Sequence, residues 1–293
     1  MGMRTSLGRK FFIISNSFFI LFITLICIIP ILHIIALSLS EKSLVAAGMV
    51  SFWPRGFTLY PYVYLFQRIA FWRSFLISII RVVTGTVLNL FLLLLTAYPL
   101  SKESVRFRFR TGYVWYFFIT ILIGGGLIPS YLLVTRLGLK NTIFALILPG
   151  ALPVFSLVLM INFFRQIPKE LEEAALIDGA GHLFTLVRIF IPCSLAAIAT
   201  VSLFCMVGHW NSWFDGMIYM SSDMKPLQTY LRDVVINLDM TKVSIQDIQT
   251  VQMLSDRSLR SAQIIISIIP IFAVYPFLQR YFVGGVILGS VKG

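Results

Sequence analysis

Hydrophobic positions in this chain form long continuous runs rather than the one-faced patterns of soluble helices. A helix needs about 20 apolar residues to cross roughly 30 Å of hydrocarbon. Six stretches reach that length, at 11–37, 74–100, 113–135, 141–164, 189–214 and 261–279. A membrane β-barrel would show strands of about 10 residues with alternating polarity, and these runs lack that alternation. The pattern predicts an all-α integral membrane protein with six transmembrane helices.

The composition supports this class. Hydrophobic residues make up 58% of the 293 residues and charged residues 12%, whereas soluble domains average about 45–50% and about 25%. The mean hydropathy is +0.89. The first apolar run exceeds the roughly 7–15 residues of a signal-peptide core, so we expect it to remain as a span.

Basic residues on short connections predict the orientation of the spans. They precede the first run and crowd the connection between the second and third runs, at Arg4, Arg9, Lys10, Lys102, Arg106, Arg108 and Arg110. Cytoplasmic loops carry an excess of Lys and Arg, so both segments and both termini should be cytoplasmic. The expected organisation is a cytoplasmic N-terminus, first helix and outer loop at 1–73, a transmembrane core at 74–280 and a cytoplasmic tail at 281–293.

No residue pattern indicates catalysis or metal binding. The cysteines and histidines are scattered without the spacing of metal ligands, at Cys27, Cys193, Cys205, His33, His182 and His209. The phosphate-cradling motif G-x-x-x-x-G-K-[ST] does not occur. We therefore expect a chain that is not an enzyme and has no cofactor or metal site, so that any ATP and Mg²⁺ would bind to a partner.

A short acidic helix is predicted at 168–178, inside the cytoplasmic connection 165–188. Pro168 suits the first helical turn, and three glutamates near that end complement the helix dipole and should solubilise the helix. A narrow face of small and apolar residues follows, and glycines can end the helix. The residues concerned are Glu170, Glu172, Glu173, Ile167, Leu171, Ala174, Ala175, Gly179 and Gly181. The helix either packs under its own bundle or fits a groove on a cytoplasmic partner.

The spacing E-A-A-x3-G-x9-I-x-L-P resembles the EAA motif of permease subunits in ATP-binding-cassette (ABC) importers. It falls on Glu173, Ala174, Ala175, Gly179, Ile189 and Pro192, with Ile191 in place of Leu. Three further stretches are similar to MalG-like sugar permeases, namely LTAYPLSK at 95–102, GGGLIPSYLLVTRLGLKNT at 124–142 and YPFLQRYFVGGVILGSVKG at 275–293. HWNSWFDGMIYM at 209–220 and the tail at 275–293 look most like the LplC and YtcP branch.

This resemblance implies the type I ABC importer permease fold and a role in sugar uptake by alternating access. It also implies a complex in the lipid bilayer of the inner membrane, with a second homologous permease subunit, a dimer of ATPase subunits that bind ATP and Mg²⁺, and an extracytoplasmic solute-binding protein. Nucleic acid is not an expected partner. Helix 168–178 would be the coupling helix seated on an ATPase subunit, and the tail 284–293 would lie against the same subunits.

The coupling residues carried over by motif match are Glu173, Ala174, Ala175 and Gly179. Asp178 is added because of its place at the helix end.

Glycine and proline interrupt two spans, the third at Gly124, Gly125, Gly126 and Pro129 and the fourth at Pro149, Gly150 and Pro153. Such breaks are tolerated where protein or a water-filled cavity covers the backbone. They also reflect the general frequency of these residues in membrane helices. An amphipathic helix is expected in the outer loop at Leu227, Leu231, Val234, Val235 and Leu238, either on the membrane or a partner or packed on the bundle.

The end of the fifth run offers candidates for the substrate path. Trp210, Asn211 and Trp213 lie at the predicted outer face, where tryptophans commonly anchor a protein in the interface. Alternatively, the indoles stack on sugar rings while Asn211 hydrogen-bonds hydroxyl groups.

Basic residues outside the cytoplasm favour an acidic substrate. The net charge is +12, and the predicted cytoplasmic segments carry 12 Lys and Arg against 5 Asp and Glu, which leaves +5 elsewhere. Arg73 and Arg81 are the path candidates among these residues, because a cationic cleft attracts carboxylates. The leading hypothesis is an alginate-type acidic oligosaccharide. Alternatives are a neutral multiple-sugar substrate, and cations that instead meet lipid phosphates or the binding protein.

A secondary transporter is the alternative from a different class of protein. It would need ion-coupling carboxylates within the membrane. No Asp or Glu lies inside the six runs.

Overall fold

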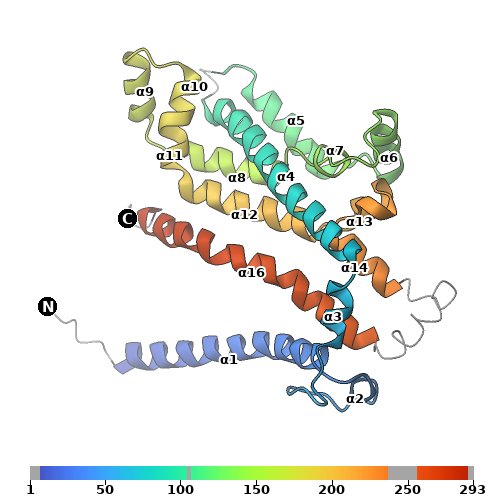
Figure 1. The fold of residues 1–293 in the computed structure, drawn as a ribbon. Coiled ribbons are helices and arrows are strands. Elements are labelled where there is room, and N and C mark those ends of the chain that lie inside the picture. Colours follow the sequence, from blue (N-terminus) through green and yellow to red (C-terminus); the bar gives the residue numbers. More distant parts are fainter. Residues whose placement is uncertain (1–6, 104–106, 237–255, 290–293) are drawn as a thin grey trace. The chain divides into compact units, whose positions relative to one another are not determined.

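The computed structural model describes residues 7–103, 107–236 and 256–289. Its regular elements in these ranges are helices (Figure 1). In the same ranges, an isolated antiparallel bridge pairs Ser40 with Phe57 outside the helices. The predicted all-α class is confirmed.

The long helices correspond to the predicted first, second and sixth spans. They are α1 (Leu7–Ser38), α4 (Ile69–Ser101) and α16 (Asp256–Gly289). Within the described ranges, three helices are long and apolar enough to cross a membrane, or up to five if each of two bent pairs is one span. The count of six spans stays a prediction.

Two predicted spans are interrupted at their glycines and prolines, as expected. In the third, α5 (Arg110–Leu122) and α6 (Leu127–Arg136) meet at a bend of 112°. Gly126 has a φ of 81° at this break, a conformation that favours glycine. In the fourth, α7 (Phe144–Ile147) is separated from α8 (Val154–Arg165) by the segment that contains Pro149 and Pro153.

The predicted span at 189–214 contains a break rather than one straight helix. Helical structure begins earlier, and its two arms form a bent pair with an angle of 86°. The elements are α10 (His182–Thr185), the π-helix η1 (Leu186–Phe190), α11 (Ile191–Cys193) and α12 (Leu195–Asn211). Pro192 has no N–H to donate, and a proline ring crowds the carbonyl four residues before it, so the regular α-helical pattern is interrupted here.

The remaining helices are short. They are α2 (Lys42–Ala46), α3 (Tyr60–Phe66), α9 (Lys169–Ile177), α13 (Phe214–Tyr219), the 3₁₀ helix η2 (Ser222–Met224) and α14 (Leu227–Ile236). The helix predicted after the fifth span is confirmed as α14, which buries Leu227 and Leu231 in the protein, whereas its outer position stays a prediction. Leu238 lies outside the described residues. The predicted tail is helical to Gly289, and 290–293 also lie outside them.

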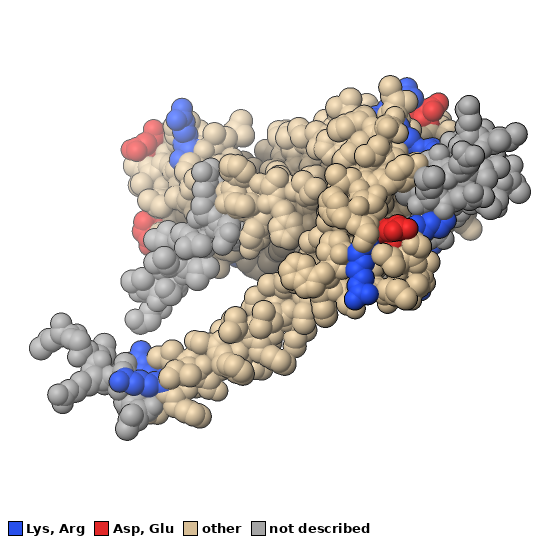
Figure 2. Space-filling model, turned by 60° about the horizontal axis from the view of Figure 1, so that its bottom comes forward, with Lys and Arg blue, Asp and Glu red and all other residues tan. Residues whose placement is uncertain are grey.

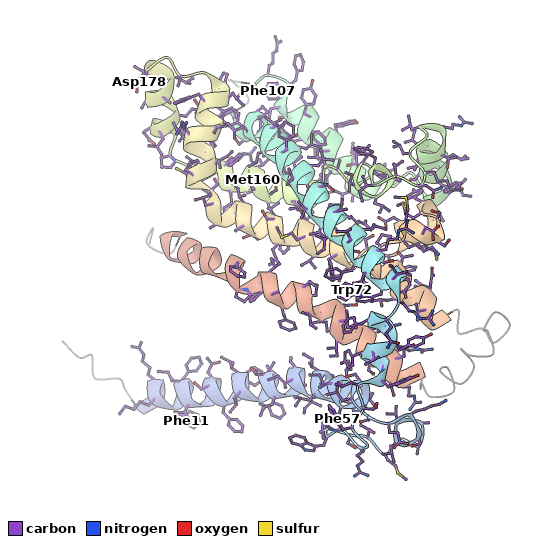
Figure 3. All side chains as sticks on the ribbon, viewed as in Figure 1. Phe11, Phe57, Trp72, Phe107, Met160 and Asp178 are labelled. Carbon is purple, nitrogen blue, oxygen red and sulfur yellow. The ribbon has the colours of Figure 1, made fainter. Side chains whose placement is uncertain are left out.

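The chain divides into two units, one formed by Met1–Arg68 with Asp233–Ile269 and the other by Ile69–Arg232 with Pro270–Gly293. In the first unit, α1 carries Arg9 and Lys10 near its start and uncharged side chains beyond them (Figure 2). Phe11 projects from this helix with 76% of its surface exposed (Figure 3). The Tyr62 hydroxyl donates to Ser38 Oγ at 2.8 Å, which fastens α3 to the end of α1.

The second unit has its core between α4, α8 and α12. Met160 lies at its centre (Figure 3), fully buried with Leu93 and Val201. Lipid is as apolar as these side chains, so close packing rather than exclusion of water holds such helices together. Gly85 on α4 shows how close the approach is, because a Cβ there would lie 2.4 Å from Nε2 of His209 on α12.

We predict that Gly216→Ala destabilises the second unit. The added Cβ would lie 2.3 Å from Thr229 Oγ1 and 2.8 Å from Pro226 Cδ, and overpacking of this kind costs about 1–3 kcal/mol. The midpoint of thermal unfolding in detergent should fall. Gly112→Ala is the control, since nothing lies within 4 Å of its Cβ position. Equal midpoints for the two variants would contradict the packing described here.

Candidate functional site

Helix α9 begins and ends as the sequence predicts, with one shift in register. Pro168 occupies the N-cap, with φ −55° and ψ 132°, rather than the first turn, and Glu170 and Glu172 follow in that turn. At the other end, the N–H of Gly179 donates to Leu176 O at 3.1 Å and the N–H of Ala180 to Ala175 O at 2.9 Å. This pair of bonds is a Schellman motif, which requires a left-handed residue. Gly179 supplies it with a φ of 78°.

The apolar face of α9 differs from the predicted one. Ala175 turns inward and is buried, whereas Leu171 and Ala174 turn outward together with Ile177, which is 85% exposed. These three residues are spaced by three along the helix and share one side. Asp178 caps the C-terminal end (Figure 3). The helix thus presents an exposed apolar strip next to its glycine turn.

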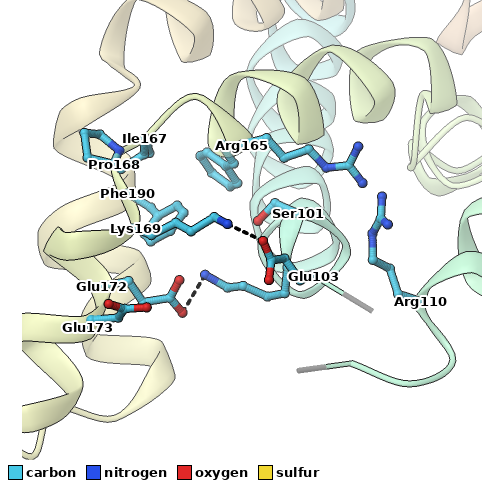
Figure 4. A pocket seen from close by; sticks show the side chains of 12 residues that line it. Ser101, Glu103, Arg110, Arg165, Ile167, Pro168, Lys169, Glu172, Glu173 and Phe190 are labelled. Atoms are coloured by element: carbon cyan, nitrogen blue, oxygen red, sulfur yellow. Dashed lines mark hydrogen bonds and ion pairs between the residues drawn. The ribbon is translucent and has the colours of Figure 1, made fainter. Parts of the chain in front are cut away.

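Glu172 departs from the expected role of the acids, which was to solubilise the helix. Its side chain is 7% exposed and lies 2.8 Å from Nζ of Lys102, which comes from the end of α4 (Figure 4). A second, exposed ion pair joins Lys169 to Glu103. Both pairs line a cavity of about 390 Å³. Only part of the acidic character of α9 therefore faces solvent.

A second polar cluster surrounds Arg81, a charge within the second predicted span. The guanidinium donates to both carboxylate oxygens of Asp215 and to two backbone carbonyls, Ser212 O at 3.3 Å and Leu146 O at 3.4 Å. The Arg81 side chain is 3% exposed. A charge in such a position is stable only when it is paired, and Asp215 provides the pair.

Asn89 lies two turns further along α4 and fastens the break before α8. Its Nδ2 donates to Gly150 O at 3.0 Å and to Ala151 O at 2.8 Å. Its Oδ1 lies 2.7 Å from Nε2 of His209. One side chain thus joins α4, the irregular segment and α12.

These groups line a cavity of about 320 Å³ between α4, the break before α8, α12 and α13. Its polar lining includes Arg81, Asn89, His209, Ser212 and Asp215. Tyr219 also lines it. Burial, followed by the negative charge of Asp215, raises the pKa of this hydroxyl above its ordinary value, so it stays a neutral hydrogen-bonding group. A cavity with several convergent polar groups is suited to hydroxylated ligands.

The predicted path residues are spread over different surroundings. Arg81 lines the cavity, whereas Arg73 lies outside its lining with a 62% exposed side chain, 3.8 Å from Asp223. Trp210 is 4% exposed and packs edge-on against Phe75. Trp213 carries the guanidinium of Arg232 on its ring at 3.4 Å, and Asn211 is exposed.

Sequence reasoning missed Asn89, His209 and Asp215. Asn89 was visible as an amide inside an apolar run, and Asp215 directly follows the fifth predicted span. Among the residues that the structure describes, no group of three or more His, Cys, Asp or Glu could hold a metal ion.

Comparisons with known proteins all find transport proteins of the inner membrane or their relatives. The family model described as "Binding-protein-dependent transport system inner membrane component" matches residues 127–288. The chain is 41% identical to Protein LplC of Bacillus subtilis (strain 168), over 99% of this chain and 97% of that protein. It is 37% identical to the polygalacturonan/rhamnogalacturonan transport system permease protein YtcP of the same organism, over 94% and 96%.

A solved structure is similar over almost the whole length of the chain. It is the crystal structure of a bacterial ABC transporter involved in the import of the acidic polysaccharide alginate. One of its chains matches with a TM-score of 0.83 and 31% identity, over 96% of this chain and 100% of that chain.

We predict that Asp215→Asn lowers stability because it leaves the Arg81 charge buried without its counter-ion. The expected cost is about 2 kcal/mol, below the roughly 3–5 kcal/mol of fully buried pairs, since the Asp215 side chain is 23% exposed. The measurement is the thermal unfolding midpoint in detergent. Asp223→Asn breaks only the exposed contact with Arg73 and serves as the control, because exposed pairs contribute little. The prediction fails if both variants unfold at the same temperature.

Proposed function

The chain belongs to the family of inner membrane components of binding-protein-dependent transport systems, and we propose that its substrate is an acidic oligosaccharide. The chain is the membrane-embedded permease subunit of an oligosaccharide ABC importer, a transport subunit and not an enzyme. Membership of this family excludes the secondary-transporter alternative. Among oligosaccharides, a uronate chain of the alginate type fits best.

The similarity to the alginate importer carries this proposal, because the likeness extends over 96% of the chain. The name of YtcP points to the same chemistry, since polygalacturonan is also built of uronate units with one carboxylate each. Charge adds support. The chain has a net charge of +12, more than its predicted cytoplasmic segments account for. A neutral oligosaccharide is the alternative that the experiment below tests.

The proposed path begins at the exposed Arg73 and leads past Asn211 and Trp213 toward the cavity. Arg73 meets the carboxylates of the entering chain, because its side chain is 62% exposed and its 3.8 Å ion pair with Asp223 is open to solvent. Trp213 stacks on a sugar ring when Arg232 leaves its face, and Trp210 supports the site from its buried contact with Phe75. Arg81 meets a carboxylate only when Asp215 releases it, since the two are paired in this conformation.

On the proposed cytoplasmic side, α9 docks onto an ATPase subunit. The exposed strip of Leu171, Ala174 and Ile177 fits an apolar groove, a common mode of helix recognition. Glu173 and Asp178 flank the strip, while Ala175 and Gly179 set the position and the end of the helix. The further proposed partners are a second homologous permease subunit, the other ATPase subunit with ATP and Mg²⁺ on the pair, and an extracytoplasmic solute-binding protein. Both termini of the chain are then cytoplasmic.

We expect the reconstituted importer to transport uronate oligosaccharides in preference to neutral ones of equal length. Uptake and stimulated ATPase activity would be measured at low and moderate salt, and the preference should weaken as salt screens the charges. Arg73→Gln should reduce uronate uptake more than neutral uptake. Arg108→Gln removes an equal charge from the opposite predicted side and should leave the preference unchanged. A preference for the neutral sugar that neither salt nor Arg73→Gln alters would refute the acidic substrate.

We expect Gly179→Leu to uncouple ATP hydrolysis from transport. Leu at a φ of 78° strains the turn by roughly 1–2 kcal/mol, although nothing lies within 4 Å of the new Cβ. Transport per ATP hydrolysed should fall more than the amount of assembled complex. Gly181→Leu is the matched control, because Gly181 has a φ of −74° and equally open surroundings. An unchanged ratio in assembled Gly179→Leu complex would remove the coupling role of this turn.

A further inference from the structure

The ion pair between Lys102 and Glu172 forms a junction of three elements. Lys102 follows the end of α4, Glu172 lies on α9, and the aromatic rings around the ammonium group come from α4 and η1. Nζ of Lys102 lies 3.8 Å from the ring centre of Tyr98 and 4.0 Å from that of Phe190. The ammonium is thus held by one carboxylate and two aromatic faces.

Burial fixes the geometry of the ion pair between Lys102 and Glu172. The side chains of Lys102 and Glu172 are 11% and 7% exposed, whereas those of Lys169 and Glu103 in the neighbouring pair are 65% and 58% exposed. Exposed pairs are screened by water and salt and hold their partners loosely. A buried pair keeps its geometry, because separation would leave each charge desolvated and unpaired.

The junction also extends into the packed core. Phe190 stands edge-on to Tyr98 with ring centres 4.9 Å apart and to Phe164 of α8 at 5.3 Å. All three rings belong to the core cluster around Met160. A displacement of Glu172 therefore acts on well-packed groups rather than on mobile surface chains.

The chain itself connects α9 only to α8 on one side and to α10 on the other. Helix α4 lies more than 60 residues away in sequence and can follow α9 only through contacts between side chains. Arg81 and Asn89, which line the cavity at Arg81, are on this same helix, which stays helical past Pro99 to Ser101. About 30 Å of helix separates Arg81 from the end at Ser101, at 1.5 Å per residue.

We propose that Lys102 and Glu172 are a positioning pair that transmits the movement of α9 to α4, and through α4 to the cavity at Arg81. This proposal rests on the proposed docking of α9 to an ATPase subunit. It adds a direct route to α4, beside the movement that α8, which is covalently connected to α9, passes on through its packing against α4 in the core. Lys102 and Glu172 contact neither sugar nor ATP.

The test uses the complete importer in proteoliposomes with its sugar-loaded binding protein. Lys102→Met and Glu172→Gln should each lower transport per ATP hydrolysed by about ten-fold, the change that corresponds to ~1.4 kcal/mol of coupling free energy. The double variant should lose no more than either single one, because both act through the same contact. Lys102→Arg should restore part of the ratio. The ratio is measured on assembled complex, so a loss of stability alone leaves it unchanged.

Glu103→Gln is the matched control, since it removes a carboxylate from the exposed pair at the same junction, and it should keep the wild-type ratio. If Lys102→Met fails to assemble, Glu172→Asp keeps the charge and shortens its reach by one methylene, and its ratio should still fall. A wild-type ratio in assembled Glu172→Gln or Glu172→Asp overturns the proposal. If Gly179→Leu uncouples while these variants do not, α9 retains its proposed function and only this route fails.

Discussion

The need of buried backbone groups for hydrogen-bond partners governs the second unit. Water cannot satisfy carbonyl groups inside hydrocarbon, so an interrupted membrane helix must find partners within the protein. Two side chains of α4 supply them. Asn89 donates to Gly150 O and Ala151 O, and Arg81 to Leu146 O and Ser212 O. The continuous helix thus completes the broken ones, and the polar lining of the cavity is a by-product of this completion.

The same helix joins the two candidate sites. Its middle part holds the interrupted segments, and its C-terminal end meets α9 through the ammonium group of Lys102. An unbroken helix suits both purposes, because a sharp bend would absorb movement between its two ends. The described residues include such bends in the α5–α6 pair and in the pair ending with α12. The proposed coupling of this contact to the cavity at Arg81 therefore depends on the continuity of α4.

The sequence was informative wherever local chemistry decides the structure. The glycine turn at Gly179 and the break at Gly126 follow from backbone conformations that glycine adopts most easily. It was less informative where distant segments meet. The charge of Arg81 was recognised but its partner Asp215 was not, because the two are 134 positions apart. The burial of Glu172 likewise depends on Lys102, and no periodicity within α9 indicates a contact with α4.

The close approach of α4 and α12 at Gly85 restricts which substitutions this protein tolerates in evolution. A methyl group there would meet the ring of His209, and that ring is bonded to the amide that holds Gly150 and Ala151. A larger side chain at Gly85 therefore displaces the His209 ring, and a change of His209 removes the partner of Asn89 Oδ1. We expect the residues at these three positions to covary among related sequences. Such covariation would reflect the close packing beside this cavity.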